Sequence, residues 1–386
     1  MKRGAFITAT ALAPLAAAPV RAALPGVRIG VLAPGPLDAI TDVAGVAVGH
    51  VTKIEGAAGP LVPGKGPVRT GVTVVLPNDA IWTRRVAAAT YDLNGNGEMT
   101  GAHWVDEAGF LETPIALTNT LDVGRVDDGV IDWMIGRWPQ IGVRDDVPLP
   151  VVMECDDQGL NDIVGRHVLA EDAVAALKAA APSAFARGNV GAGTGMRAFG
   201  FKAGIGTASR KSGTGNDTVG VLLNANTGSR AELRIDGVPV GRILQNEYKP
   251  LVPQRSSDLE HGRAADGSVV VVIATDAPLL ARQLHELCKR AVLGLARTGI
   301  TSHVSSGDLL MAFSTTRLYP RDGAPVALAE IEDDARLDAL FAATAEAAEA
   351  AVVDALLSAR TLSGARGITF YALPVERVAE LLKAAR

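Results

Sequence analysis

Apolar runs rich in β-branched and small residues recur along the first two-thirds of the chain, and they predict strands. These runs lie at 39–52, 69–77, 113–124, 150–163, 217–228 and 231–241. The runs at 113–124 and 150–163 begin as strands and then continue into polar residues. The last two runs, which only two residues separate, predict a pair of neighbouring strands.

Polar and glycine-rich segments separate these runs. Residues 91–101 contain two Asn-Gly pairs and predict a loop. Apolar residues at helical spacing over 165–181 predict a helix that ends before Pro182. The stretch 188–210 is rich in glycine, and the 42 glycines of the whole chain indicate many tight turns and close backbone approaches.

The last third of the chain alternates strands with helices. A polar segment with two prolines, 249–267, predicts a surface loop, and a valine-rich strand at 268–278 follows it directly. The remaining expected elements are a helix at 279–298, a strand at 307–316 and helices at 326–360 and 375–385. Strands and helices arranged in such blocks predict sheets covered by layers of helices.

Composition and charge exclude several classes of protein. The chain has 386 residues and is 48% hydrophobic, which is ample for a large buried core, and no linker divides it. We therefore expect one large domain. The formal net charge is −5 and no cluster of Lys and Arg stands out, so a nucleic-acid partner is not expected. No segment reaches the roughly 20 apolar residues that a membrane-spanning helix needs.

The N-terminus has the layout of a secretory signal peptide. Lys2 and Arg3 precede an apolar stretch at 4–20, and the residues around Ala22 resemble a small-residue cleavage site. We expect a signal peptide at 1–22, a mature chain that begins near Ala23, and a periplasmic or secreted protein. An N-terminal extension of a cytosolic protein is the alternative.

Three other candidate motifs are incomplete. The two cysteines, Cys155 and Cys288, form no disulfide framework; one bridge could join them, but a buried free thiol is favoured for Cys288. The H-E-x-x-H zinc pattern that begins at His285 has Lys289 in place of its second histidine, so neither a metal site nor a cofactor is expected. The run 191–195 lacks the glycine spacing of nucleotide-binding loops, which favours a tight loop with close backbone packing.

The junction between Gly267 and Ser268 could support self-cleavage. A polar loop ends in glycine there, and the serine opens a run of four valines. Glycine permits a strained backbone, and a strained carbonyl held against the serine hydroxyl can undergo an N→O acyl shift followed by ester hydrolysis. Cleavage would leave Ser268 with an α-amine of pKa about 7.7–8.0, which can act as the base for its own hydroxyl. A Gly-Ser pair before a strand is common, so an ordinary turn is the alternative reading of this pair alone.

Several longer motifs carry a specific resemblance. They are AITDVAGVAVGHVT, RTGVTVVLP, LNGNGEMTG, LNDI with RGNVGAGTGM, FKAGIGTASR, GSVVVVIATDAPL and SSGDLLMAFST. Together they resemble the family of L-aminopeptidase/D-esterases and β-peptidyl aminopeptidases over roughly residues 39–320. The resemblance implies an α/β fold, a four-layer α/β/β/α sandwich similar to N-terminal-nucleophile hydrolases with different connectivity. It also implies self-cleavage into a larger chain, 23–267, and a smaller chain, 268–386, which stay together.

The resemblance assigns catalytic roles residue by residue. The family's N-terminal serine, at the start of its valine-rich strand, matches Ser268. Its second serine and the acid of its Ser-Gly-acid motif match Ser306 and Asp308, although the family's acid is often Glu. Ser306 would bridge Ser268 and Asp308 by hydrogen bonds. The family's asparagine in V-L-x-x-A-N matches Asn226, which would donate a hydrogen bond to the oxyanion.

A substrate-binding acid is implied in the same way. The acid that follows the family's PVV strand matches Glu154, which would hold the amino group of the substrate. Related proteins can carry a tyrosine two positions later, where this chain has Asp156, so no oxyanion role is assigned to Asp156. Cys155 lies between these two acids, and a packing role is expected for it.

These observations favour an exported, self-processing aminopeptidase or amidase. Its substrate would be a small peptide, amide or ester with a free amine, and the family implies a homo-oligomer of processed chains. An acyltransferase of the ornithine acetyltransferase type is a second hypothesis, against which the serine nucleophile and the signal peptide both count. A non-catalytic binding protein with the same fold is a third. The preference among β-, D- and L-aminoacyl substrates does not follow from the sequence.

Overall fold

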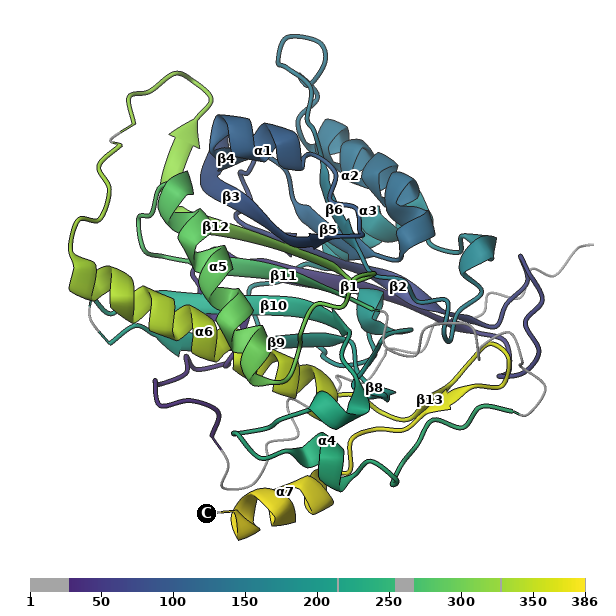
Figure 1. Cartoon of the computed structure of the whole chain (residues 1–386). Helices are drawn as coiled ribbons and strands as arrows, with labels where there is room; N and C mark the ends of the chain where they lie inside the picture. Colours follow the sequence, from purple (N-terminus) through teal and green to yellow (C-terminus); the bar gives the residue numbers. More distant parts are fainter. Residues whose placement is uncertain (1–27, 214, 254–266, 327, 386) are drawn as a thin grey trace, which may run out of the picture.

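Two β-sheets pack face to face at the centre of the molecule (Figure 1). The computed structural model describes residues 28–213, 215–253, 267–326 and 328–385. The first sheet has the order β1-β2-β5-β6. Its strands are β1 (Ala47–Glu55), β2 (Val68–Leu76), β5 (Ile115–Thr118) and β6 (Val151–Glu154).

The second sheet is larger and contains the Gly267-Ser268 junction at one strand end. Its order is β4-β3-β12-β11-β10-β9. Its strands are β4 (Phe110–Leu111), β3 (Arg84–Gly95), β12 (Gly307–Pro320), β11 (Ser268–Thr275), β10 (Thr218–Asn226) and β9 (Ile205–Lys211). Strand β11 pairs antiparallel with β10 and parallel with β12.

Helices cover the outer face of each sheet (Figure 1). Helices α2 (Val123–Arg137) and α3 (Ala170–Ala179) pack on the first sheet. Helices α5 (Ala281–Arg297) and α6 (Asp334–Leu357) pack on the second sheet and on each other. The expected four-layer α/β/β/α sandwich is therefore confirmed.

The valine run after Ser268 shows why the core has this layered form. Val270, Val272 and Ala274 lie in the apolar layer between the two sheets. Val269, Val271 and Ile273 point the other way, into the layer shared with α5 and α6. Because side chains alternate along a strand, a strand buried on both faces needs apolar residues at every position.

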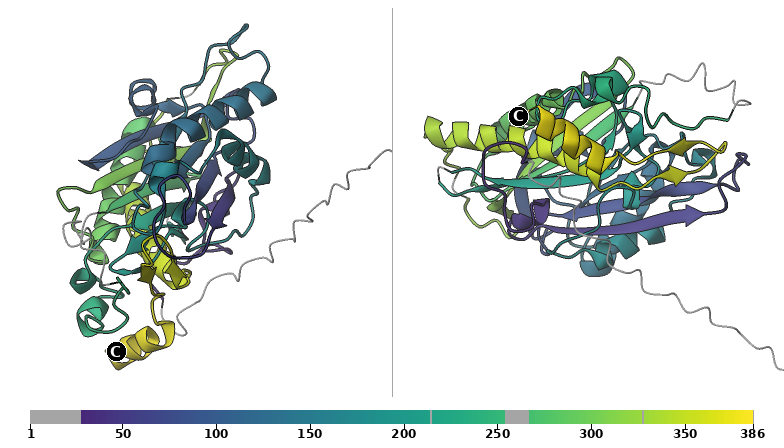
Figure 2. Two further views of the ribbon diagram at one scale, coloured as in Figure 1. Left: turned by 90° about the vertical axis from the view of Figure 1, so that its right-hand side faces the viewer. Right: turned by 90° about the horizontal axis from the view of Figure 1, so that it is seen from below.

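Shorter elements complete the chain outside the sandwich. They are α1 (Ala102–Ala108), α4 (Val240–Ile243), α7 (Val375–Ala384) and the two-residue strands β7 (Arg197–Ala198), β8 (Phe201–Lys202), β13 (Leu362–Ser363) and β14 (Thr369–Phe370). Helix α7 lies near the C-terminus of the chain (Figure 2). It shares an apolar cluster with α4.

Most predicted elements occur, and two predictions were wrong. The strand expected at 231–241 is absent, because Asp236 and Gly237 take positive φ values of 51° and 76° and form a tight turn there. The loop expected at 91–101 begins only after Gly95, since the Asn-Gly pair at 94–95 pairs with β12 and extends β3. Helix α6 begins later than expected, where the Asp333 side chain caps it by accepting a hydrogen bond from the Ala335 N–H group.

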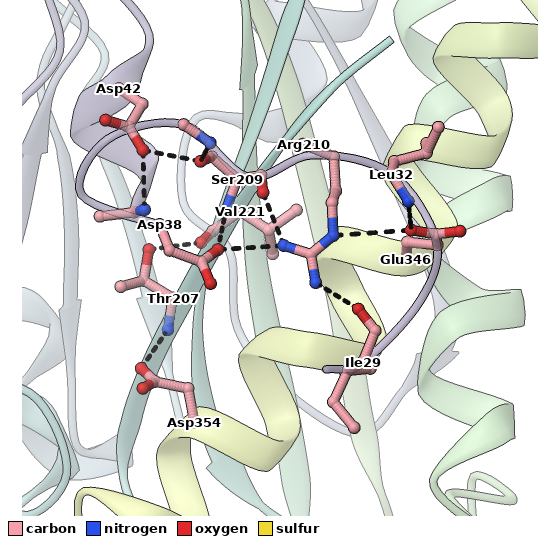
Figure 3. Close-up of polar contacts among 12 residues, drawn as sticks. Ile29, Leu32, Asp38, Asp42, Thr207, Ser209, Arg210, Val221, Glu346 and Asp354 are labelled. Carbon is pink, nitrogen blue, oxygen red and sulfur yellow. Dashed lines mark hydrogen bonds and ion pairs between the residues drawn. The ribbon is translucent and has the colours of Figure 1, made fainter. Parts of the chain in front are cut away.

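The segment that follows residue 28 is held to the free edge of β9 by a buried polar clasp (Figure 3). Arg210 forms an ion pair with Asp38 at 3.0 Å and donates to the carbonyl oxygen of Ile29 at 2.7 Å. Glu346 of α6 accepts hydrogen bonds from the backbone N–H groups of Val31 and Leu32. The clasp therefore covers an edge strand that would otherwise expose unpaired backbone groups.

Some of the predicted segments contain residues that the structure does not describe. The signal peptide at 1–22, the start near Ala23 and most of the loop at 249–267 lie outside the described residues.

Cys155 and Cys288 are both buried and free, which confirms the favoured free thiol at Cys288. In the described part of the chain, helices are too short or too polar to cross a membrane.

Candidate active site

Ser268 lies at the point where three neighbouring strands bring distant parts of the sequence together. It is the first residue of β11, its side chain is 7% exposed, and it lies opposite Asn226 on β10. On the other side, Val269 lies opposite Asp308 on β12. The hydroxyl oxygen of Ser268 accepts a hydrogen bond from the Gly307 N–H group at 3.3 Å. Three of the predicted catalytic residues are thus neighbours in one sheet.

Gly267 is required by close packing. A β-carbon on this residue would lie 1.8 Å from the carbonyl oxygen of Asn226 and 3.0 Å from the α-carbon of Thr227. Its φ angle does not lie in the left-handed region. The structure therefore gives a steric reason for glycine at this position, since only a residue without a side chain fits against β10.

Ser306 and Asp308 form a buried hydrogen-bonded pair. The Ser306 hydroxyl donates to Oδ1 of Asp308 at 2.6 Å, and the same oxygen accepts from the Val269 N–H group at 3.2 Å. The aspartate therefore reaches its partner although the family often has the longer glutamate. The hydroxyl of Ser268 is contacted by the Gly307 N–H group and not by the Ser306 hydroxyl. Of the expected bridge, the hydrogen bond from Ser306 to Asp308 is therefore present and the one between Ser306 and Ser268 is not.

The Asn226 side chain is held at both of its polar atoms. Its Oδ1 accepts a hydrogen bond from the Arg197 N–H group at 3.2 Å, and its Nδ2 donates to the carbonyl oxygen of Asp156 at 2.8 Å. An amide nitrogen carries two hydrogens, so one remains for a substrate oxygen. Asp156 thus orients Asn226 through its backbone. Sequence reasoning missed this because a backbone carbonyl has no residue-type signal.

Glu154 ends β6 of the first sheet and faces the same place from the opposite layer. Its Oε1 accepts a hydrogen bond from the Glu98 N–H group at 3.1 Å, and its Oε2 accepts one from the Thr120 hydroxyl. Gly97 lies between Glu154 of the first sheet and Gly307 of the second. A β-carbon on Gly97 would be 3.2 Å from Oε1 of Glu154 and 3.3 Å from the α-carbon of Gly307. Glu154, the predicted substrate-binding acid, and the segment beside Ser268 are therefore neighbours.

The loop that begins with the Asn-Gly pairs holds this arrangement together. The side-chain amides of Asn94 and Asn96 donate to the carbonyl oxygens of His303 and Ser305, each at 2.7 Å. The backbone of Gly97 packs against Gly307, where a β-carbon would meet Asn96 at 2.4 Å. The two Asn-Gly pairs were recognised in the sequence, but they predicted only a turn. That their side-chain amides would hold the segment before β12 did not follow from the pattern.

Three acids meet at the site, of which Glu154 and Asp308 are buried and Asp156 is half-buried. Burial raises the pKa of Glu154, of Asp156 and of Asp308, and hydrogen bonds to each carboxyl group lower it in part. Cys155 lies among these acids, and burial followed by their charges raises the pKa of its thiol well above the ordinary value. The thiol is therefore unreactive, and a cation such as an ammonium group would stabilise the ionised acids.

Two of the rejected motifs have structural roles. His285 places Nδ1 2.8 Å from the carbonyl oxygen of Thr90 and packs edge-on against Tyr91. Within the described ranges, no group of three His, Cys, Asp or Glu residues could hold a metal ion. The glycine run 191–195 packs tightly against neighbouring backbone, as expected.

Comparisons with known proteins agree with this geometry. The model of peptidase family S58 matches residues 38–370. Beta-peptidyl aminopeptidase BapA of Sphingosinicella xenopeptidilytica is 42% identical over 356 residues, which cover 91% of this chain and 88% of that protein. The crystal structure of the PH0078 protein from Pyrococcus horikoshii OT3 is similar with a TM-score of 0.85 and 44% identity, covering 93% of this chain and 98% of the other.

A third similarity concerns the fold and the class of enzyme. The L-aminopeptidase D-Ala-esterase/amidase of Ochrobactrum anthropi, described as a prototype of the serine aminopeptidases and a variant of the Ntn hydrolase fold, aligns with a TM-score of 0.81 and 36% identity. The alignment covers 92% of this chain and 96% of that one. The chain therefore belongs to peptidase family S58 and is an aminopeptidase of that family.

Proposed function

We propose that this aminopeptidase cleaves itself between Gly267 and Ser268 and then uses Ser268 as an N-terminal nucleophile. The observation that carries the proposal is the place of Ser268 at the start of β11, with its hydroxyl against the Gly307 N–H group and Asn226 directly opposite. A new N-terminus at this point would put an α-amine and a hydroxyl on the same residue, at the centre of the predicted site.

The cleavage step balances without an outside reactant other than water. The Ser268 hydroxyl oxygen attacks the Gly267 carbonyl carbon, and the carbon–nitrogen bond to Ser268 breaks. The hydroxyl proton passes to the leaving nitrogen, which becomes the α-amine. Water then hydrolyses the ester and leaves a carboxylate on Gly267. Gly267 suits this position because the backbone there lies so close to Asn226 of β10 that no side chain fits.

Substrate hydrolysis would use the same residues. The free α-amine of Ser268, of reference pKa about 7.7–8.0, takes the proton of the hydroxyl as it attacks the substrate carbonyl. The second hydrogen of the Asn226 amide would donate to the oxyanion, and Ser306 with Asp308 would fix the start of β12. The bond from the carbonyl carbon to the leaving amine then breaks as the Ser268 amine passes the proton to that leaving group. Water, whose proton the Ser268 amine takes, finally hydrolyses the acyl ester on Ser268 and releases the N-terminal residue as a carboxylate.

The acids of the site support a substrate with a free amine. Glu154 would accept a hydrogen bond from the substrate ammonium, and Asp156 would add to the negative potential there. A charge-assisted hydrogen bond of this kind is roughly twice as strong as a neutral one. We infer hydrolysis of the bond after a free N-terminal β-amino acid, D-Ala or small L-amino acid, by an exported enzyme that assembles as a homo-oligomer.

The test is the Ser268→Ala variant, with Ser183→Ala at an exposed serine as the matched control. Wild type and control should give two fragments by intact mass, one ending at Gly267 and one beginning at Ser268. Ser268→Ala should give one inactive chain. Normal processing of Ser268→Ala would assign cleavage to an outside protease, and an active uncleaved wild type would refute the proposed nucleophile.

Export and assembly have their own measurements. N-terminal sequencing of exported protein should find a start within a few residues of Ala23, and active cytosolic protein that retains Met1 would contradict export. Sedimentation of the processed protein should give a mass several times that of one chain, and a monomer would contradict assembly.

A further inference from the structure

Lys202 is a completely buried lysine that one peptide group connects to Asn226, the predicted oxyanion donor. Its side chain is 0% exposed, and its ammonium nitrogen lies 3.2 Å, 2.5 Å and 2.7 Å from the carbonyl oxygens of Gly193, Met196 and Ala203. An ammonium group has three hydrogens to donate, and three acceptors surround it. A neutral amine has only two, so the site matches the protonated form.

The glycine-rich stretch builds the cage around this ammonium group. A β-carbon on Gly193 would lie 2.4 Å from the Ile205 nitrogen, and one on Gly204 would lie 2.2 Å from the Gly188 carbonyl oxygen. The backbone is therefore too closely packed for the carbonyl groups to turn away. Burial lowers the pKa of Lys202 well below its ordinary value and raises the pKa of the nearby Asp157 carboxyl group to about 8, while the charge of Asp157 raises the pKa of Lys202 in part. The three carbonyl acceptors are therefore what favours the ammonium form.

One peptide group connects this cage to the active site. The Met196 carbonyl oxygen accepts from Lys202, and the N–H group of Arg197 belongs to the same peptide unit. That N–H group donates to Oδ1 of Asn226 at 3.2 Å. A hydrogen bond to the oxygen of an amide polarises the whole amide and strengthens the bond that its N–H group donates. The same effect then applies to the side-chain amide of Asn226.

We propose that Lys202 is a positioning residue for oxyanion stabilisation, which fixes and polarises the Met196–Arg197 peptide group and, through it, the amide of Asn226. This inference rests on the proposed function, in which Asn226 donates to the oxyanion. Lys202 does not touch the substrate. Its role is to make the Asn226 N–H group a stronger donor and to hold it in one orientation.

The first experiment is Lys202→Met, which keeps an unbranched side chain and removes the charge. Activity is normalised to the processed fraction measured by intact mass. The kcat for a free-amine p-nitroanilide should fall about tenfold, less than the roughly 10²–10³-fold loss typical when an oxyanion donor is removed. The KM should stay within about twofold, because Glu154 still binds the ammonium group of the substrate.

A double-mutant cycle separates positioning from a general structural effect. If Lys202 acts through Asn226, adding Lys202→Met to Asn226→Ala should cause no further loss of kcat. The matched control is Arg210→Met, which removes another buried cation, in the clasp and away from this peptide group. Its effect on kcat should be the same with and without Asn226→Ala.

The outcomes decide the proposal. Multiplicative losses from Lys202→Met and Asn226→Ala, or an unchanged kcat in Lys202→Met, would overturn it. If Lys202→Met does not fold, Lys202→Gln, which retains two N–H donors, replaces it in the same cycle. Loss of folding in both would assign Lys202 to stability alone and overturn the proposal. An inactive Ser268→Ala beside a fully active Lys202→Met would refute this inference and leave the proposed function standing.

Discussion

Gly267→Ala is the substitution whose effect follows most directly from the geometry of the cleavage site. The added β-carbon would lie 1.8 Å from the carbonyl oxygen of Asn226 and 2.8 Å from its carbonyl carbon, where ordinary contacts begin at 3.4 Å. Both atoms belong to the backbone of β10, so no side-chain rotation relieves the clash. The start of β11 must therefore move away from β10 by more than about 1 Å.

This displacement sets the expected magnitudes. Overpacking of this kind typically lowers the free energy of unfolding by about 1–3 kcal/mol, which a large domain survives. The reacting atoms are more sensitive, because a misplacement of about 1 Å can slow a reaction roughly 10²-fold. The displaced Ser268 hydroxyl would also leave the Gly307 N–H group, which lies 3.3 Å away. We expect self-cleavage to slow by about 10²-fold in a folded protein.

The assay is a time course of intact mass after synthesis, run beside thermal unfolding. The matched control is Gly124→Ala, since a β-carbon on this helical glycine of α2 meets nothing within 4 Å. The control should cleave at the wild-type rate and gain about 0.5–1 kcal/mol of stability. Cleavage of Gly267→Ala at the wild-type rate, with normal unfolding, would show that close packing at this glycine does not serve the reaction.

Three further predictions concern the processed enzyme. Glu154→Gln should lower kcat/KM for free-amine substrates by about 10–10²-fold, because a charged hydrogen bond worth about 1.5–3 kcal/mol is lost. The kcat/KM for N-acetyl substrates should not change, and equal losses for both kinds of substrate would show that Glu154 does not bind the amine. Because burial raises the pKa of Glu154, the affinity for a free-amine inhibitor should decline as the pH falls through a value above 4.5, and an inhibition constant independent of pH down to 4.5 would contradict this. Since the proposed base is the Ser268 amine and the oxyanion donor is an amide, activity should survive dialysis against EDTA, and a loss restored by zinc would refute that mechanism.

The sequence pattern predicted strands most accurately where both faces of the strand are buried. The valines after Ser268 face two apolar layers, so their pattern determines a buried strand without further information. Helix α2 was not predicted, because glycines interrupt its apolar pattern. One of them, Gly129, has no room for a β-carbon, which would lie 2.3 Å from the Ala170 carbonyl oxygen. A residue that weakens the helix pattern is thus required by the close approach of α3.

Site residues could be predicted only where a side chain carries the chemistry. Ser268, Ser306, Asp308 and Asn226 were assigned by resemblance, and adjacent strands bring them together. The backbone partners of Asn226, from Asp156 and Arg197, could not be inferred, because any residue type supplies the same carbonyl and N–H groups. The sequence also contains no signal for the packing of β6 across from β11.

The two sheets contribute different parts of the proposed reaction. Strands β10, β11 and β12 of the second sheet bring the proposed nucleophile, Ser268, and the proposed oxyanion donor, Asn226, together through backbone pairing. Glu154, at the end of β6, approaches from the first sheet, and its carboxylate is held by the Glu98 N–H group. The proposed cleavage after Gly267 would free the amine of Ser268, and the strand pairs on either side of β11 need not change. The proposed nucleophile can therefore be created by breaking one bond in a site whose hydrogen bonds and acids are already in place.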